Sequence, residues 1–309
     1  MASESVLAGV ELGGTKAITV LARGREIIDR KKIDTTTPEE TLGLLRQHLD
    51  VWKSREGFAA LGIASFGPIS LDPGSRDNGR ILATPKPGWS GALVTETLTA
   101  GLDCPWRVDT DVNAAALAEW RWGVGREMTS VVYITLGTGV GGGFVFDGEP
   151  LHGALHPEVG HLRLRRAPGD RFEGTCPFHG DCIEGLISGP ALQARFGSVA
   201  AEVPDDDQTC AFVQHDLVEL IEAIALMVSP QVVLIGGGVG MRRPFLLAGA
   251  REQLVERLGN YLPHISSDTV SGFVSNPRFG EDAGPMGAIA LAQAALDDSR
   301  SQSSRSNRA

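Results

Sequence analysis

Short apolar runs separated by glycine-containing turns dominate the beginning of the chain. Residues 6–12 and 17–22 are mostly apolar and lie on either side of the turn Gly13-Gly14-Thr15-Lys16, a pattern that predicts two strands joined by a tight turn. A third strand is predicted over residues 26–29, and the apolar run at residues 59–64 predicts a buried strand.

Between these strands the pattern changes to the period of a helix. Thr37 is a typical N-cap, Pro38 suits the first helical position, and Glu40 stands where it closes a capping box. The apolar side chains that follow recur at helical spacing, at Leu42, Leu45, Leu49 and Trp52. An amphipathic helix is therefore predicted from Pro38.

The same order of elements recurs further along the chain. Residues 130–136 predict a strand, Gly137-Thr138-Gly139 a turn, and Asp147-Gly148 a hairpin after a second strand. Glu11-Leu12-Gly13 then aligns with Thr135-Leu136-Gly137. This repeat indicates two related halves, although common strand and turn chemistry could produce it by coincidence.

The last third of the chain predicts three more elements and a tail. Residues 216–227 predict a helix, and residues 231–235 a strand that runs into Gly236-Gly237-Gly238. Residues 288–296 predict a final helix. The polar residues 297–309 have no apolar face, and we expect them to be a disordered tail.

Composition narrows the class of protein. Glycine makes up 39 of the 309 residues, above the average usage of about 7%, and it clusters as it does where a backbone approaches a ligand closely. The length favours two domains. A net charge of −10 disfavours nucleic acid as a partner. The sequence has neither an apolar run long enough for a membrane span nor the features of a signal peptide, and 4 cysteines suggest no disulfide scaffold. We expect a cytoplasmic protein with no membrane partner.

The glycine turns are candidate phosphate sites. Successive backbone N–H groups in such turns form a concavity that binds anions; Thr15 and Thr138 add hydroxyl groups and Lys16 adds a charge. Ordinary β-turns would need the same glycines for geometry alone. The fingerprints of Walker NTPases and of Rossmann dinucleotide sites are both missing from the sequence.

Two further groups of residues suggest chemistry. Asp109 and Asp111 end a short strand just before an alanine-rich helix, where a carboxylate can act as a general base, bind a cation or merely cap the helix. Cys176, His179 and Cys182 recur at three-residue spacing, and His161 upstream completes a donor set that suits structural zinc. The alternative is two buried thiols with two surface histidines. Cys104 and Cys210 are isolated and are predicted to be inert core residues.

Taken together, these motifs resemble the ROK family of sugar kinases, and within it the bacterial zinc-containing fructokinase branch. The resemblance runs from Gly9 to about Ala292 and rests on segments in the family's order. They are residues 11–16 and 136–142 (phosphate motifs), 110–114 (catalytic aspartate), 158–161 and 176–182 (zinc signature), 235–239 (adenosine loop) and 283–288 (closing motif).

The resemblance implies an α/β, actin-like ATPase (ribonuclease H-like) fold with two duplicated domains and nucleotide in the cleft between them. The domain bounds that we expect are 1–112 plus about 288–300, then 113–287, with the tail at 297–309. The resemblance also implies a homodimer.

It implies ATP and Mg²⁺ as cofactors, structural Zn²⁺, and Asp111 as the general base. The residues implied for ATP are Gly13, Gly14, Thr15, Lys16, Gly137, Thr138, Gly139, Pro190, Gly236, Gly237 and Gly238. Those implied for the sugar are Thr110, Asn113, Glu158, His161 and Glu184. Those implied for zinc are His161, Cys176, His179 and Cys182.

Departures from the broad family pattern bear on the substrate. Thr110 stands where glucokinases of the family place Asn, His179 replaces a cysteine, and residues 83–89 resemble fructokinases. The expected reaction is therefore ATP-dependent phosphorylation of D-fructose on its 6-hydroxyl to fructose 6-phosphate, with mannose or glucose as the alternative acceptor. A sugar-responsive transcription regulator is disfavoured because the sequence has no DNA-binding module before the first phosphate motif. A filament or chaperone ATPase would not need the zinc set, and a catalytically silent relative would lack Asp111.

Overall fold

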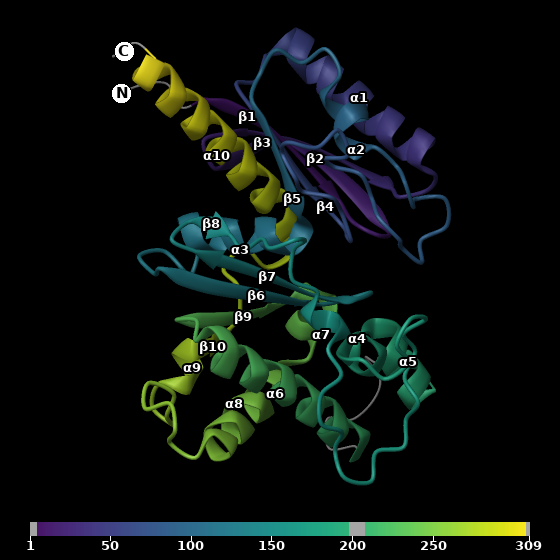
Figure 1. Cartoon of the computed structure of the whole chain (residues 1–309), viewed down its shortest axis with the longest axis vertical. Coiled ribbons are helices and arrows are strands. Elements are labelled where there is room, and N and C mark those ends of the chain that lie inside the picture. Colours follow the sequence, from purple (N-terminus) through teal and green to yellow (C-terminus); the bar gives the residue numbers. More distant parts are fainter. Residues whose placement is uncertain (1–4, 198–207, 307–309) are drawn as a thin grey trace. The chain divides into compact units, whose positions relative to one another are not determined.

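The structure, a computed structural model, describes residues 5–197 and 208–306. The chain divides into two compact units. The first comprises the residues up to Arg121, the segment Pro150–His156 and the residues from Asp282 onward; the second comprises Trp122–Glu149 and Pro157–Glu281. Each unit is built on a five-stranded sheet with helices packed against it (Figure 1).

The sheet of the first unit has the strand order β3-β2-β1-β4-β5. β1 pairs antiparallel with β2 and parallel with β4, and β4 pairs parallel with β5. The strands are β1 (Val6–Leu12), β2 (Lys16–Arg23), β3 (Glu26–Asp34), β4 (Leu61–Ser65) and β5 (Trp106–Thr110). The parallel strands β1, β4 and β5 bring their carboxyl ends to one edge, where ligands of open α/β sheets usually bind.

Helices cover both faces of this sheet. They are α1 (Pro38–Arg55), α2 (Val94–Thr99), α3 (Asp111–Trp122) and α10 (Ala283–Ser306). The apolar side of α1 packs with Ala8, Val10 and Leu12 of β1 in one core cluster. Gly9 and Gly62 face the other side, where α10 lies so close that a Cβ at Gly62 would overlap its backbone. Figure 1 shows α10, in yellow, running along the sheet.

The start of α1 agrees with its predicted capping chemistry only in part. The Thr37 side chain accepts a hydrogen bond from the Glu40 backbone N at 3.3 Å, as an N-cap should. The Glu40 carboxylate, however, accepts from the Thr36 hydroxyl at 2.6 Å. Thr37 is therefore the N-cap as predicted, whereas the Glu40 side chain bonds to Thr36.

The second unit repeats the design of the first. Its strand order is β10-β9-β6-β7-β8, with β6 antiparallel to β7 and parallel to β9. The strands are β6 (Ser130–Leu136), β7 (Val140–Phe146), β8 (Glu149–Pro150), β9 (Val232–Gly236) and β10 (Val274–Ser275). Its helices are α4 (Ile183–Ile187), α5 (Gly189–Phe196), α6 (Gln208–Val228), α7 (Gly237–Arg242), α8 (Pro244–Leu258) and α9 (Val270–Phe273). Short 3₁₀ turns lie at Val159–His161 and Gly280–Asp282.

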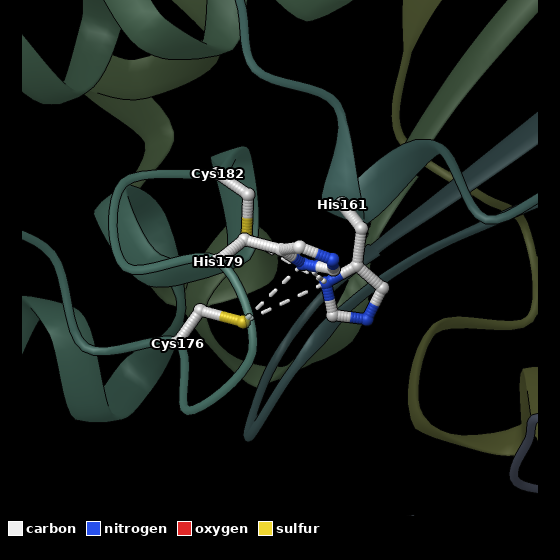
Figure 2. A group of neighbouring side chains, drawn as sticks. All are labelled: His161, Cys176, His179 and Cys182. Carbon is white, nitrogen blue, oxygen red and sulfur yellow. Dashed lines mark hydrogen bonds between the residues drawn. The ribbon is translucent and has the colours of Figure 1, made fainter. Parts of the chain in front are cut away.

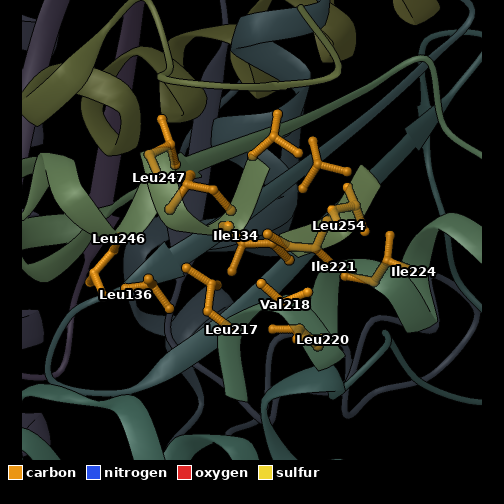
Figure 3. Close-up of a cluster of buried hydrophobic side chains, with 14 of the residues drawn as sticks. Ile134, Leu136, Leu217, Val218, Leu220, Ile221, Ile224, Leu246, Leu247 and Leu254 are labelled. Carbon is orange, nitrogen blue, oxygen red and sulfur yellow. The ribbon is translucent and has the colours of Figure 1, made fainter. Parts of the chain in front are cut away.

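The core of the second unit lies between its sheet and two long helices. Figure 3 shows Ile134 and Leu136 of β6 against Leu217 and Ile221 of α6, with Leu254 of α8 in the same cluster. All of these side chains are almost completely buried. The two sheets have matching strand order and direction, which confirms the predicted α/β fold with two duplicated halves.

The chain differs from the prediction at its C-terminal end. A disordered tail from residue 297 is wrong for residues 297–306, which continue α10; residues 307–309 lie outside the described part. Polar contacts support this part of the helix. Asp297 pairs with Arg121 at 2.9 Å, and the hydroxyl groups of Ser301 and Ser303 donate to carbonyls four residues earlier. A helical segment stabilised by polar contacts of this kind has no apolar face that would reveal it in the sequence.

The unit boundaries also differ from the expected domain bounds. Most of α3 and the segment Pro150–His156 group with the first unit, although the sequence placed residues 113–287 in the second domain. The reason is local packing, because a Cβ at Gly287 of α10 would lie 2.6 Å from the Ala114 backbone of α3. Within the described ranges, no helix combines the length and hydrophobicity that a membrane span needs.

Candidate active site and metal centre

The junction of β5 and α3 carries the predicted catalytic aspartate. The Thr110 hydroxyl accepts from the backbone N of Asn113 at 3.1 Å, so Thr110 caps the helix through its side chain. Asp111 is the first helical residue, and its Oδ1 accepts from the Val112 backbone N at 2.9 Å. The helix therefore does not depend on Asp111 as its cap, which favours a chemical role for this carboxylate.

A second carboxylate lies at the same sheet edge. Glu11 of β1 is in register with Ala64 of β4, which is in register with Asp109 of β5. Burial raises the pKa of Asp111 to about 6. Burial, together with the charge of Asp111, raises the pKa of Glu11 to about 7. Two nearby carboxyl groups that ionise reluctantly are typical of a site that holds a cation or moves a proton.

Asp109 is completely buried beside this junction. Its Oδ1 accepts from the Thr110 backbone N at 2.7 Å and from the Asn113 side-chain amide at 2.8 Å. Its Oδ2 lies 3.0 Å from Nε2 of His152, which forms an ion pair with it when the imidazole is protonated. The carboxylate thereby fixes the amide of Asn113. The sequence prediction included Asn113 and missed this role of His152, which only its position near other histidines could have suggested.

The first glycine turn presents open backbone N–H groups. Gly13 N donates to Lys16 O at 3.0 Å, and Thr35 holds the turn by donating from Oγ1 to Gly13 O at 2.8 Å and from its backbone N to Thr15 O at 3.0 Å. Gly14 and Thr15 are exposed, and within the described ranges their N–H groups have no acceptor. This arrangement can receive an anion.

The second glycine turn, Gly137–Gly139, is bound by segments that follow it in the chain. Gly189 N donates to Gly137 O at 2.7 Å, and Val140 N donates to Oε2 of Glu184 at 3.1 Å. A Cβ at Gly139 would lie 2.6 Å from that same carboxylate oxygen. The predicted sugar ligand Glu184 therefore contacts the predicted phosphate turn directly.

The third glycine cluster has a reason in packing. Gly236 ends β9 and Gly237 begins α7, and a Cβ at either residue would overlap the neighbouring strand β6, at Tyr133 and at Leu136. Gly238 faces open space. Pro190, at the beginning of α5, is also exposed. Contact of these residues with adenosine stays a prediction.

Four side chains converge on one point in the second unit. The ligand atoms of His161, Cys176, His179 and Cys182 all lie within 4.8 Å of one another (Figure 2). The Nδ1 atoms of the histidines are 3.3 Å apart, and Nδ1 of His161 is 3.5 Å from Sγ of Cys182 and 3.7 Å from Sγ of Cys176. Ligands at tetrahedral angles around zinc, with bonds of about 2.3 Å to sulfur and about 2.0–2.1 Å to nitrogen, would be separated by about 3.3–3.8 Å. The donor set and its spacing therefore fit zinc.

The backbone around these four residues is tightly organised. Cys176 and Gly180 exchange backbone hydrogen bonds of 3.1 and 2.9 Å, and Arg163 donates to the His179 carbonyl at 2.6 Å. Both cysteines are free and buried, and burial raises the pKa of the Cys182 thiol to about 11. The fold brings all four side chains together, which the alternative of two buried thiols with two separate surface histidines does not explain, and zinc binding itself stays a prediction.

Two of the predicted sugar ligands of this unit lie next to the cluster in the chain. Glu158 immediately precedes the 3₁₀ turn that carries His161, and Glu184 lies in α4 just after Cys182. Gly160 packs so closely on β7 that a Cβ there would overlap the Val140 carbonyl. The four-ligand cluster, Glu158, Glu184 and the second glycine turn form one connected structure.

The duplicated sheets and the glycine turn after the first strand of each define an α/β protein of the actin-like ATPase fold. The chain belongs to the ROK family, whose sequence profile matches residues 7–295. It is 39% identical over 295 residues to a putative fructokinase of Bacillus subtilis (strain 168), covering 94% of this chain and 96% of the relative. It is also 39% identical over 295 residues to a fructokinase of Zymomonas mobilis, covering 93% and 96%.

Solved structures share the fold. The ROK hexokinase from Thermus thermophilus superposes with a TM-score of 0.73 at 25% identity, covering 95% of this chain and 99% of that one. A ROK family glucokinase from Streptomyces griseus, solved with glucose and AMPPNP, superposes with a TM-score of 0.72 at 24% identity, covering 93% and 99%.

Proposed function

We propose that this chain is an ATP-dependent fructokinase that transfers the γ-phosphoryl group of ATP to the 6-hydroxyl of D-fructose, giving ADP and fructose 6-phosphate. The observation that carries the proposal is Asp111, which begins α3, is not needed as its cap, and has a pKa raised to about 6. Such a carboxylate is ionised at neutral pH yet basic enough to accept the proton of an attacking hydroxyl. The fructokinases among the relatives support fructose as the acceptor.

The glycine turns would bind the nucleotide. We assign the phosphates to Gly13, Gly14, Thr15 and Lys16 of the first unit and to Gly137, Thr138 and Gly139 of the second, with Pro190 and Gly236, Gly237 and Gly238 near the nucleoside. Phosphoryl transfer depends mainly on positioning and on neutralising the phosphate oxygens. Mg²⁺ would supply part of that charge, and the carboxylates of Glu11 and Asp111 are ligands of the kind it prefers.

The proposed sugar ligands are oriented by their neighbours in the structure. The side-chain amide of Asn113 is held by Asp109, which would direct this side chain toward a sugar hydroxyl. His161 turns Nδ1 toward the four-ligand cluster, so that Nε2 remains to donate. Glu184 uses Oε2 on Val140, which leaves Oε1. Thr110 and Glu158 complete the proposed set.

Zinc would occupy the cluster formed by His161, Cys176, His179 and Cys182. Four protein ligands close the coordination sphere, so the ion would be structural and would not bind substrate. Its effect on fructose would be indirect, through the backbone that carries Glu158 and Glu184. We further propose a homodimer, which the family resemblance supports, and a cytoplasmic location, which four cysteines outside any disulfide bond support. Light scattering coupled to size exclusion tests the dimer.

A substrate panel tests the proposed reaction. ADP release would be measured with ATP and Mg²⁺ and with fructose, mannose, glucose or N-acetylated hexosamines, and the product would be identified by ³¹P NMR. We expect the highest kcat/KM with fructose and a phosphate on C6. A higher kcat/KM with mannose or glucose would favour the second candidate function, that of a hexokinase. The similar protein from Thermus thermophilus is a ROK hexokinase. No turnover with any sugar would contradict the proposal.

The buried Asp109 offers a sharper test of the site. In Asp109→Asn the new amide keeps one oxygen but replaces the other with an NH₂ group, which cannot accept and would therefore disturb the contact with Nε2 of His152 or the one with the amide of Asn113. We expect kcat/KM for fructose to fall by about tenfold or more, the cost of misplacing one hydrogen-bonding group, while ADP binding changes little.

Asp103→Asn provides the matched control, because Asp103 is an exposed aspartate of the same unit. Steady-state kinetics and thermal unfolding would be measured for both variants. Unchanged fructose kinetics in a folded Asp109→Asn protein would show that Asp109 does not position the sugar ligands.

A further inference from the structure

The loop at residues 83–89 is held firmly against the first unit. Trp89 is completely buried, donates from Nε1 to the Thr36 carbonyl at 2.8 Å, and packs edge-on against Phe66 with ring centroids 5.2 Å apart. Pro85 and Pro87 flank Lys86 and restrict the backbone on both sides of it. Lys86 is therefore presented from a rigid loop.

Lys86 reaches from this loop to the first glycine turn. Its Nζ donates to the carbonyl of Gly14 at 2.6 Å and to the carbonyl of Thr35 at 3.2 Å. Both acceptors are neutral, and in the part of the chain that the structure describes no carboxylate forms an ion pair with Lys86. The side chain is half-buried. The ammonium group therefore binds backbone carbonyls of the turn and of the neighbouring Thr35.

Peptide geometry determines what this contact does. In a trans peptide the C=O and the following N–H point in opposite directions. When Lys86 holds the Gly14 carbonyl, the N–H of Thr15 must point away from Lys86. This N–H is exposed and has no acceptor within the described ranges.

Thr35 binds the carbonyls of the two neighbouring peptides of the turn. It donates to the carbonyls of Gly13 and Thr15, and thereby orients the N–H groups of Gly14 and Lys16. The carbonyls of Gly13, Gly14 and Thr15 are thus all bound by protein donors. Lys86 supplies the donor for Gly14, the middle carbonyl of the three.

We propose that Lys86 is a positioning residue of the first phosphate turn: by binding the Gly14 carbonyl, it orients the Thr15 N–H toward the phosphates of the nucleotide without contacting them itself. The inference rests on the proposed kinase function and goes beyond it, because it assigns nucleotide affinity to a residue outside the glycine motif. Free rotation of the Gly14–Thr15 peptide would let the carbonyl dipole face the anion instead, which weakens binding.

The test measures the binding of ADP and of inorganic pyrophosphate to the full-length protein by calorimetry. In Lys86→Met we expect both dissociation constants to rise about tenfold or more, the scale of one hydrogen bond to a charged group. Lys86→Arg keeps a donor that can reach a carbonyl and should recover most of the affinity. In kinetics, KM for ATP should rise, whereas KM for fructose should stay near the parent value.

Lys53→Met is the matched control. Lys53 belongs to the same unit and also donates to a carbonyl, that of Phe58 at 3.5 Å, but it does not contact the turn. Its removal should leave both ligands bound as in the parent. The loss in Lys86→Met should persist at 0.5 M salt, about where screening confines Coulomb attraction to a few ångströms. A loss that disappears in salt would show simple charge attraction and overturn the proposal.

The outcomes separate the two proposals. If the parent protein binds neither ADP nor pyrophosphate, the kinase function itself fails. If the parent binds them and Lys86→Met binds equally well, only the role of Lys86 fails. Should Lys86→Met not fold, as judged by thermal unfolding, Lys86→Ala carries the same test, because alanine also removes the donor to the Gly14 carbonyl and suits a half-exposed position.

Discussion

Replacement of Asp111 by asparagine is expected to lower kcat by about 10²- to 10⁴-fold, the contribution of a positioned general base. The amide has nearly the same shape but cannot accept the proton of the fructose hydroxyl. Folding should be retained, since Thr110 rather than Asp111 caps α3 through its side chain. Steady-state ADP release gives kcat, and calorimetry with ADP shows whether nucleotide binding is intact. A variant within a few-fold of the parent rate would rule out Asp111 as the base.

The pH dependence gives the same prediction a second readout. Burial raises the pKa of Asp111 to about 6, so the carboxylate accepts a proton from substrate only above that pH. The rate of the parent should therefore fall as pH drops through about 6. Glu11, with its pKa raised to about 7 by burial and by Asp111, titrates with it, so that the observed values belong to the pair. Because asparagine does not titrate, the Asp111→Asn variant should not show the fall in rate near pH 6 that Asp111 causes in the parent.

Stability should change in the opposite direction to activity. The pKa of Asp111 in the folded protein, about 6, is above its ordinary value of 3.8, so ionising this group is harder in the folded state than in the unfolded one. Its favourable contribution exists below pH 3.8 and is lost as pH rises through about 6. At pH 7.5 the asparagine variant should therefore unfold at the same or a higher temperature than the parent.

Disruption of the proposed zinc site is the second change with a large expected effect. Cys176→Ser removes one of four ligands, and we expect the purified protein to lose the roughly one zinc per chain that a closed four-ligand site requires. Binding of a structural zinc contributes strongly to folding, so thermal unfolding should begin at a clearly lower temperature. The kcat/KM for fructose should fall as well, because Glu184, which bonds to the second glycine turn, follows Cys182 in the same segment.

Cys104→Ser is the control for this experiment, because Cys104 is also a free cysteine but lies outside the cluster. Elemental analysis, thermal unfolding and kcat/KM for fructose would be compared among the parent and both variants. An active parent protein that contains no zinc, or a Cys176→Ser protein that retains its metal and stability, would contradict the structural role of the ion.

Much of this arrangement follows from local patterns. Alternating or continuous apolar runs predicted the strands, Thr37 and Pro38 predicted the start of α1, and the repeated strand-turn-strand pattern predicted the duplicated sheet. The three-residue spacing of Cys176, His179 and Cys182 suggested a metal site because each residue type is itself a zinc ligand. These features depend on neighbours within a few residues, which the sequence displays directly.

Other features depend on which elements meet. The continuation of α10 through residue 306 is supported in part by the ion pair of Asp297 with Arg121. The helix α3 groups with the first unit because it packs against Gly287 of α10. Gly236 and Gly237 resemble a ligand loop in the sequence, yet the close approach of β6 already requires them to be glycine. No local pattern reveals such distant partners.

The glycine turns, the strand-turn-strand repeat and the ligand types of the candidate metal site could be recognised along the chain, because each is a property of short-range order and side-chain chemistry, whereas the α/β fold was implied by the family resemblance. Three contacts became evident only in the folded chain: Thr110 rather than Asp111 caps α3, Asp109 holds Asn113, and Lys86 holds Gly14 from a loop far along the chain. Hydrogen bonds and burial arise when the chain folds, and they determine which of several chemically suitable residues is free to act.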